Sequence, residues 1–148
     1  MPRPASIITF ERLYLAGLAL SLVSWALDWP LMQARLAANP QTAPFGWMLS
    51  VMLLLNIAGS LLLWFFTARR ASVVAKWLVV VFAGLSALRF LLNLPAALGG
   101  AMTATSLLLA TLTTGLSVTA AAMLFRTDAR AWFGEDVDGD DDVVEDVA

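Results

Sequence analysis

Four long apolar stretches dominate the chain, and short polar or turn-forming segments separate them. The stretches cover approximately residues 13–32, 45–68, 77–94 and 101–125. A helix needs about 20 mostly apolar residues to cross the roughly 30 Å hydrocarbon core of a bilayer, and each stretch approaches or exceeds that length. The pattern therefore predicts four membrane-spanning helices.

The connections between these stretches contain residues that end helices. The first, 33–44, is polar and holds an Asn-Pro pair, and the second, 69–76, is short and basic. Pro95 and the glycine pair at 99–100 divide what would otherwise be one apolar run. Short connections place consecutive helices side by side and antiparallel. We therefore expect an all-α, integral membrane, up-down-up-down four-helix bundle.

Composition agrees with a membrane protein and excludes several kinds of chemistry. Hydrophobic residues make up 60% of the 148 residues and charged residues only 14%, against roughly 45–50% and 25% in soluble domains. The chain has no Cys and no His. Thiol chemistry, Cys/His metal sites and haem ligation by His or Cys are therefore excluded. We expect no cofactor and no metal.

The acidic residues are concentrated at the C-terminus. Residues 1–133 carry nine basic and three acidic residues, a net charge of +6, and residues 134–148 carry eight acidic residues. The acidic segment lacks the glycine and the final glutamate of a calcium loop, so we expect a disordered acidic tail after a membrane domain that ends at residue 133. Residues 127–133 are expected to continue the fourth helix and to place Trp132 and Phe133 at the membrane surface.

Basic residues also predict the orientation, because they favour the cytoplasmic side of a membrane. With both termini inside, seven basic residues lie inside and two, Arg35 and Arg89, lie toward the outside. The seven are Arg3, Arg12, Arg69, Arg70, Lys76, Arg126 and Arg130. A cleaved secretory signal is the alternative for the first stretch, but Asp28 between two tryptophans does not suit one. We expect a multi-pass protein of the bacterial inner membrane with cytoplasmic termini.

Polar residues inside the predicted spans are the candidate functional positions, because such groups are unfavourable in lipid. Counted along their helices, Asp28 lies roughly 22 Å and Arg89 roughly 18 Å from the cytoplasmic boundary. The similar depth predicts a salt bridge between them, which either locks the bundle or contributes to a gate. Arg89 with Asn93, one helical turn further, is the alternative as an anion site.

Asn56 and two helix faces of small residues are the remaining features of interest inside the spans. Asn56 lies near the middle of the second span, where its amide needs a hydrogen-bond partner. Small residues recur at helical spacing in the first and fourth spans, at Gly17, Ser21, Ser24 and Asp28, and at Ser106, Ala110, Thr113, Ser117 and Ala121. Such faces allow close helix packing in lipid, and a hydroxyl-lined path for an ion or polar solute is the alternative.

The N-terminal sequence, with Phe10-Glu11-Arg12-Leu13-Tyr14 before the first span, resembles the start of small, uncharacterised bacterial inner-membrane proteins with four predicted spans. The resemblance rests on about the first twenty residues, and the similarity of layout extends over most of 1–133. It implies a four-span membrane fold. It implies no activity and no site residue.

Two functions are compatible with these features. The first is a non-enzymatic membrane protein that acts through helix–helix association, as a homo-oligomer or as an accessory subunit of a membrane complex. The second is a small transporter or channel for an ion or small polar solute, with Asp28, Asn56, Arg89 and Asn93 along its path. The sequence shows no nucleophile–base pair that would indicate an enzyme. The sequence indicates the bilayer as partner, with no nucleic acid and no identifiable small-molecule ligand.

Overall fold

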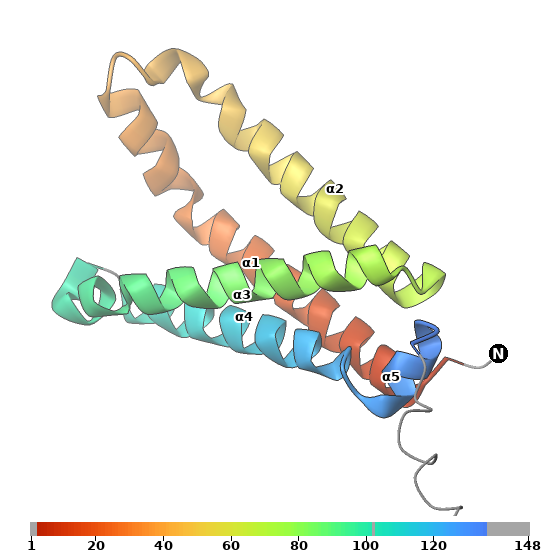
Figure 1. Cartoon of the computed structure of the whole chain (residues 1–148). Helices are drawn as coiled ribbons and strands as arrows, with labels where there is room; N and C mark the ends of the chain where they lie inside the picture. Colours follow the sequence, from red (N-terminus) through yellow and green to blue (C-terminus); the bar gives the residue numbers. More distant parts are fainter. Residues whose placement is uncertain (1–2, 102, 136–148) are drawn as a thin grey trace, which may run out of the picture.

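The computed structural model describes residues 3–101 and 103–135, and every regular element in these ranges is helical. The four long helices are α1 (Ala5–Ala38), α2 (Trp47–Arg70), α3 (Val73–Ala96) and α4 (Ala104–Met123). The short elements are η1 (Ala43–Phe45), η2 (Ala97–Ala101) and α5 (Thr127–Trp132). Consecutive long helices run antiparallel (Figure 1). The prediction of an all-α chain with four helices long and apolar enough to span a membrane is confirmed.

The helices differ from the apolar stretches at their ends. α1 has 34 residues and continues through Pro30, well beyond the predicted 13–32. Its C-terminal flank, residues 33–38, is rich in Ala, Leu and Arg, which are good helix formers, so the helix extends past the apolar part at that end. At the start of α3 the Ser72 hydroxyl accepts a hydrogen bond from the Ala75 amide, and Thr103 does the same for Ser106 at the start of α4.

The turn between α3 and α4 is made by glycine rather than by proline. Pro95 lies inside α3, near its end, and the chain continues helically into η2. Gly100 then adopts φ 91°, a left-handed conformation that disfavours residues with a Cβ. Of the two breaks that the sequence offers here, Gly100 is therefore the one that reverses the chain.

The expectation that α4 continues to residue 133 is wrong. α4 ends at Met123, the chain turns at Leu124–Arg126, and α5 folds back as a separate short helix. Phe133 is only 7% exposed, so it does not lie on the membrane surface. The turn allows Leu124, Ala129 and Phe133 to enter one buried apolar cluster, which a straight helix would leave exposed.

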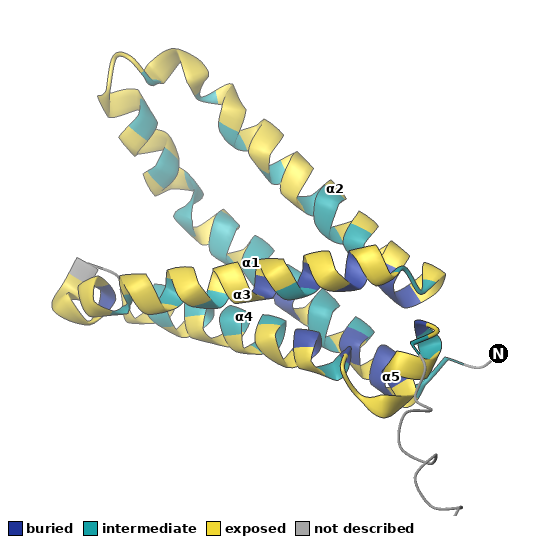
Figure 2. Ribbon diagram, viewed as in Figure 1, coloured by how far each residue is buried: buried dark blue, intermediate teal, exposed yellow. Residues whose placement is uncertain are grey.

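This cluster holds together the end of the molecule where the described chain begins and ends, which we call the terminal end. Figure 2 shows the buried residues gathered there, whereas most of α2 is exposed. The cluster takes residues from α1, α2, α3, α4 and the α5 region: Ile7, Phe10, Ala68, Val79, Ala120, Leu124, Ala129 and Phe133. The terminal end therefore fixes the relative positions of all the helices.

The small faces of α1 and α4 pack against each other, as the spacing of small residues predicts. Gly17 is buried, and a Cβ at this position would lie 3.7 Å from the Leu116 Cβ and 3.9 Å from the Ser117 Oγ. Only a residue without a large side chain allows this approach of the two helices. This contact joins the two hairpins, α1–α2 and α3–α4.

Candidate functional site

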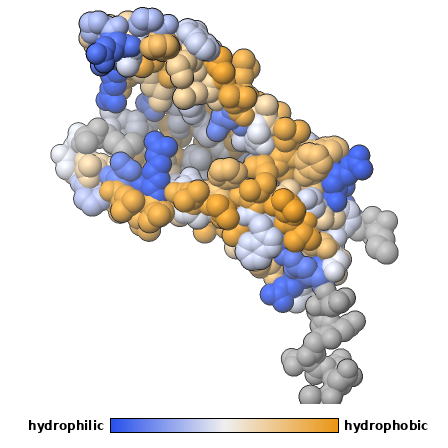
Figure 3. Space-filling model, turned by 45° about the horizontal axis from the view of Figure 1, so that its top comes forward, coloured by the Kyte–Doolittle hydropathy of each residue, from blue (hydrophilic) through white to orange (hydrophobic). Residues whose placement is uncertain are grey.

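The two hairpins diverge away from the terminal end, toward the connections at residues 39–46 and 97–101, which we call the distal end (Figure 1). A cavity of about 340 Å³ lies between α1, α3 and α4 where they separate. Figure 3 shows the molecule hollowed between its two arms, with hydrophilic groups beside the hollow and apolar side chains over much of the face. This volume falls at the lower end of the range for small-molecule sites, about 300–1,000 Å³.

The polar faces of three helices line this cavity. α1 contributes Ser21, Ser24 and Asp28, and α3 contributes Ser86, Arg89 and Asn93. α4 adds Ser106, Thr113 and Thr114. The small faces that pack tightly at Gly17 thus continue toward the distal end as the walls of the cavity.

Three of the four predicted positions meet here. Asp28, Arg89 and Asn93 line the cavity, and Asn56 does not. Asn56 is exposed on α2, and no side-chain hydrogen bond joins it to another described residue. Ser86 also lines the cavity and was not predicted, although it lies three residues before Arg89 and seven before Asn93, on the same helical face.

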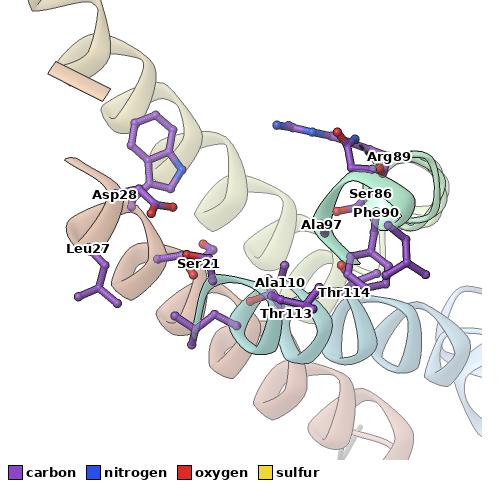
Figure 4. Close-up of a pocket in the computed structure, with 17 residues that line it drawn as sticks. Ser21, Leu27, Asp28, Ser86, Arg89, Phe90, Ala97, Ala110, Thr113 and Thr114 are labelled. Carbon is purple, nitrogen blue, oxygen red and sulfur yellow. Dashed lines mark hydrogen bonds between the residues drawn. The ribbon is translucent and has the colours of Figure 1, made fainter. Parts of the chain in front are cut away.

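The predicted salt bridge between Asp28 and Arg89 is not formed. Within residues 3–101 and 103–135, ion pairs join Arg3 with Glu11, Arg69 with Glu11, and Lys76 with Glu135. α4 contacts both α1 and α3, whereas α1 and α3 contact each other little, and the two hairpins diverge toward the distal end (Figure 1). Figure 4 shows Asp28 and Arg89 reaching into the same space from opposite sides.

Hydrogen bonds within the helices satisfy part of the polar lining. The Asn93 amide donates to the Arg89 carbonyl oxygen at 2.7 Å, and the Ser21 hydroxyl donates to the Leu18 carbonyl at 2.8 Å. The Thr113 hydroxyl is enclosed and has no hydrogen-bond partner among the described residues. The two charged groups of the cavity have no ionic partner there either. The cavity therefore retains hydrogen-bonding capacity that the fold does not use.

Lys76 forms a second polar site at the terminal end, which the sequence did not predict. Its side chain is 1% exposed, and its Nζ lies 2.7 Å from Glu135 Oε2. The ammonium also lies 5.0 Å from the Phe125 ring and 5.1 Å from the Phe133 ring. In the sequence Lys76 is one of several basic residues beside the connection between the second and third apolar stretches. Its burial could not be predicted because it depends on how the α5 region folds against α3. Glu135, placed by prediction in the acidic tail, thus contacts α3; residues 136–148 lie outside the described part.

Asp128 makes a further contact across the terminal end. Its Oδ2 accepts a hydrogen bond of 3.1 Å from the Ser6 amide, one of the unpaired N–H groups in the first turn of α1. The pKa of Asp128 is lowered, mainly by this backbone hydrogen bond, which favours the ionised carboxylate. α5 is thereby attached to the N-terminus of α1.

The lining of the cavity can bind a polar molecule through several kinds of group. Hydroxyl groups, one carboxylate, one guanidinium and one amide line the cavity, and the chain contains no His or Cys to act as base or thiolate. The described residues include no group of three or more His, Cys, Asp or Glu that could hold a metal ion. That the protein is not an enzyme remains a prediction.

Fold and cavity together define a class: an all-α protein with four helices apolar enough to cross a membrane and a polar cavity between them. Comparison with models of known families, with curated proteins and with solved structures gave no match for this chain.

Proposed function

We propose that this chain is a multi-span protein of the bacterial inner membrane, with both termini in the cytoplasm, that acts through helix–helix association. The single observation that supports association is the exposure of the apolar part of α2. The 18-residue apolar stretch of this helix contains no buried residue. Buried residues of α2 occur only at its end, at Thr67 and Ala68.

The exposed Asn56 favours contact of this helix with another helix over contact with lipid. An amide near the middle of a span has no water to bond to, and transfer of an unpaired amide to an apolar medium is unfavourable by several kcal/mol. Gly59 lies three residues further along and leaves open space beside it. A small residue next to a polar one favours close approach of another helix, from a second copy or from a membrane-complex partner.

The orientation is supported by the place of the basic residues. The seven that favour the cytoplasm lie at the ends of helices that meet at the terminal end, whereas Arg35 and Arg89 lie in the distal halves of α1 and α3. Because the chain lacks Cys, one introduced thiol reports one position. A membrane-impermeant maleimide applied to intact spheroplasts should label Gln41→Cys, and should label Ala131→Cys only after permeabilisation. The reverse pattern would overturn the orientation.

Association is tested with Asn56→Leu in native membranes. Two differently tagged copies are co-expressed and cross-linked, and an affinity pull-down identifies heterologous partners. Interhelical hydrogen bonds in lipid are worth about 0.6–2 kcal/mol, so the substitution should weaken association about three- to thirtyfold. Thr111→Val is the matched control, because its exposed hydroxyl already donates to the Leu107 carbonyl of its own helix. A monomer without partners, or equal association of both variants, would refute the proposal.

Movement of a small polar solute is the second candidate function, and the polar cavity is the observation that favours it. Purified protein in proteoliposomes should then support flux of an ion or solute, and Arg89→Leu should abolish that flux. A protein that moves nothing, and in which Arg89→Leu alters only thermal stability, is not a transporter.

A further inference from the structure

Two opposite charges face one cavity without pairing to each other. Asp28 enters from α1 and Arg89 from α3 (Figure 4), and neither forms an ion pair with another described residue. Charges at membrane depth are unfavourable unless a partner or water compensates them. In a chain of this composition, two such residues in one cavity indicate a bound group that compensates both.

The charges restrict what that group can be. An anion would neutralise Arg89 and leave the carboxylate of Asp28 without a partner, and a cation would do the reverse. A zwitterion satisfies both and adds no net charge to a site of low dielectric constant. An arginine fork matches the oxygens of phosphate or carboxylate, and a carboxylate accepts the N–H groups of a primary ammonium.

The remaining lining favours an amphiphile over a fully polar solute. Trp25, Phe90 and Leu107 line the same cavity as the charged pair. Asp28 lies roughly 22 Å into a hydrocarbon layer of about 30 Å, so its carboxylate and the long Arg89 side chain can reach the outer headgroup region. A headgroup could occupy the charged part of the cavity while its glycerol and first methylene groups contact the apolar side chains.

We propose that this cavity binds a zwitterionic headgroup of the phosphoethanolamine type, with its phosphate on Arg89 and its ammonium on Asp28. The Asn93 amide, one turn from Arg89, borders the same charged part. The ligand chemistry, a phosphate a few bonds from a primary amine, occurs both in membrane lipids and in soluble glycerophospho-compounds. The inference rests on the membrane insertion proposed above, which the thiol-labelling experiment tests separately.

Native mass spectrometry of the purified full-length protein measures the binding. Phosphatidylethanolamine is added against phosphatidylglycerol, which has the phosphate but no amine, and glycerophosphoethanolamine serves as the soluble probe. We expect phosphatidylethanolamine to be retained about tenfold or more over phosphatidylglycerol, since phosphatidylglycerol has no ammonium to bond to the Asp28 carboxylate. Asp28→Asn should abolish this preference, and Arg89→Gln should weaken binding of both lipids about tenfold or more.

Controls separate binding from folding. Arg35→Gln removes an exposed basic residue of α1 that does not line the cavity, and should leave lipid retention unchanged. Arg89→Lys keeps the positive charge and should keep the preference for phosphatidylethanolamine, even if Arg89→Gln fails to fold. If glycerophosphoethanolamine displaces the lipid, the headgroup alone is sufficient for binding. If it does not, the site takes the headgroup only as part of a membrane lipid.

Two results would overturn the proposal. The first is equal retention of the two lipids by the unmodified protein, with the soluble probe unbound. The second concerns the two single variants, Asp28→Asn and Arg89→Gln, and the variant with both changes. If their losses of thermal stability without lipid are not additive, and lipid retention does not change, the two residues pair directly with each other.

Discussion

Removal of either partner of the Lys76–Glu135 pair should destabilise the protein to very different extents. The ammonium of Lys76 is 1% exposed and the Glu135 side chain is 34% exposed, although they lie 2.7 Å apart. Glu135→Ala leaves an enclosed ammonium without an ionic partner among the described residues, and loss of one partner of a buried pair costs about 3–5 kcal/mol. Lys76→Met keeps an apolar chain in the cluster and leaves a carboxylate that can turn toward water, so we expect about 1 kcal/mol or less.

The difference of about 2–4 kcal/mol between the two variants is measurable by titration with SDS in a mild detergent. The fluorescence of the six tryptophans reports unfolding, and one of them, Trp77, contacts the Phe125 ring edge-on at 5.9 Å between ring centroids. Arg130→Met, on the exposed side of α5, is the control and should change stability by at most about 0.5 kcal/mol. If Lys76→Met destabilises the protein as much as Glu135→Ala, the argument from unequal burial is wrong.

Three further predictions use the same titration. Gly17→Ala should be tolerated or should stabilise the protein by up to about 1 kcal/mol, because the new Cβ lies 3.7 Å from α4, an ordinary contact distance. Gly17→Leu should destabilise the protein by about 1–3 kcal/mol. Equal effects of the two substitutions would contradict the close packing of α1 on α4. Gly100→Ala should destabilise by about 1–2 kcal/mol because of the positive φ, and Gly99→Ala is its control. Asp128→Asn should destabilise at neutral pH. The folded state lowers the pKa of Asp128, so the stabilisation by the Ser6 contact is present above the ordinary value near 4 and is lost as the pH falls through the lowered pKa. The difference between the variant and wild type should therefore shrink steadily as the pH falls below about 4, and a difference that does not change with pH would refute the prediction.

The long helices could be predicted from the sequence because one physical requirement dominates them. About twenty apolar residues must be helical to satisfy their backbone in lipid, and the sequence presents four such stretches. The contact of α1 with α4 was also foreseeable in part, since Gly17 and Ser117 belong to the two small faces. The helix ends were less accurate, because residues outside the apolar stretch can still favour a helix.

The position of the polar groups depends on tertiary arrangement, which spacing along single helices does not determine. Depth along the helices predicted Asp28 and Arg89 at one level, and both line one cavity, yet they do not pair, because their helices make little contact and the hairpins diverge there. The enclosure of Lys76 depends on α5, whose six residues carry no strong signal for a turn before them. Neither arrangement follows from periodicity, which identifies a face of a helix but not the helix that covers it.

The contacts that stabilise the fold and the groups that line the cavity occupy opposite ends of the molecule. The buried cluster, the Lys76–Glu135 pair and the Asp128 contact with α1 all lie at the terminal end. The charged residues of the cavity lie where the hairpins diverge and where few apolar residues are buried (Figure 2). Because distant sites contribute nearly independently to stability, substitutions at Asp28 and Arg89 should alter what the cavity binds far more than they alter folding. A fold that is closed at one end and open at the other thus keeps two opposite charges available to a ligand.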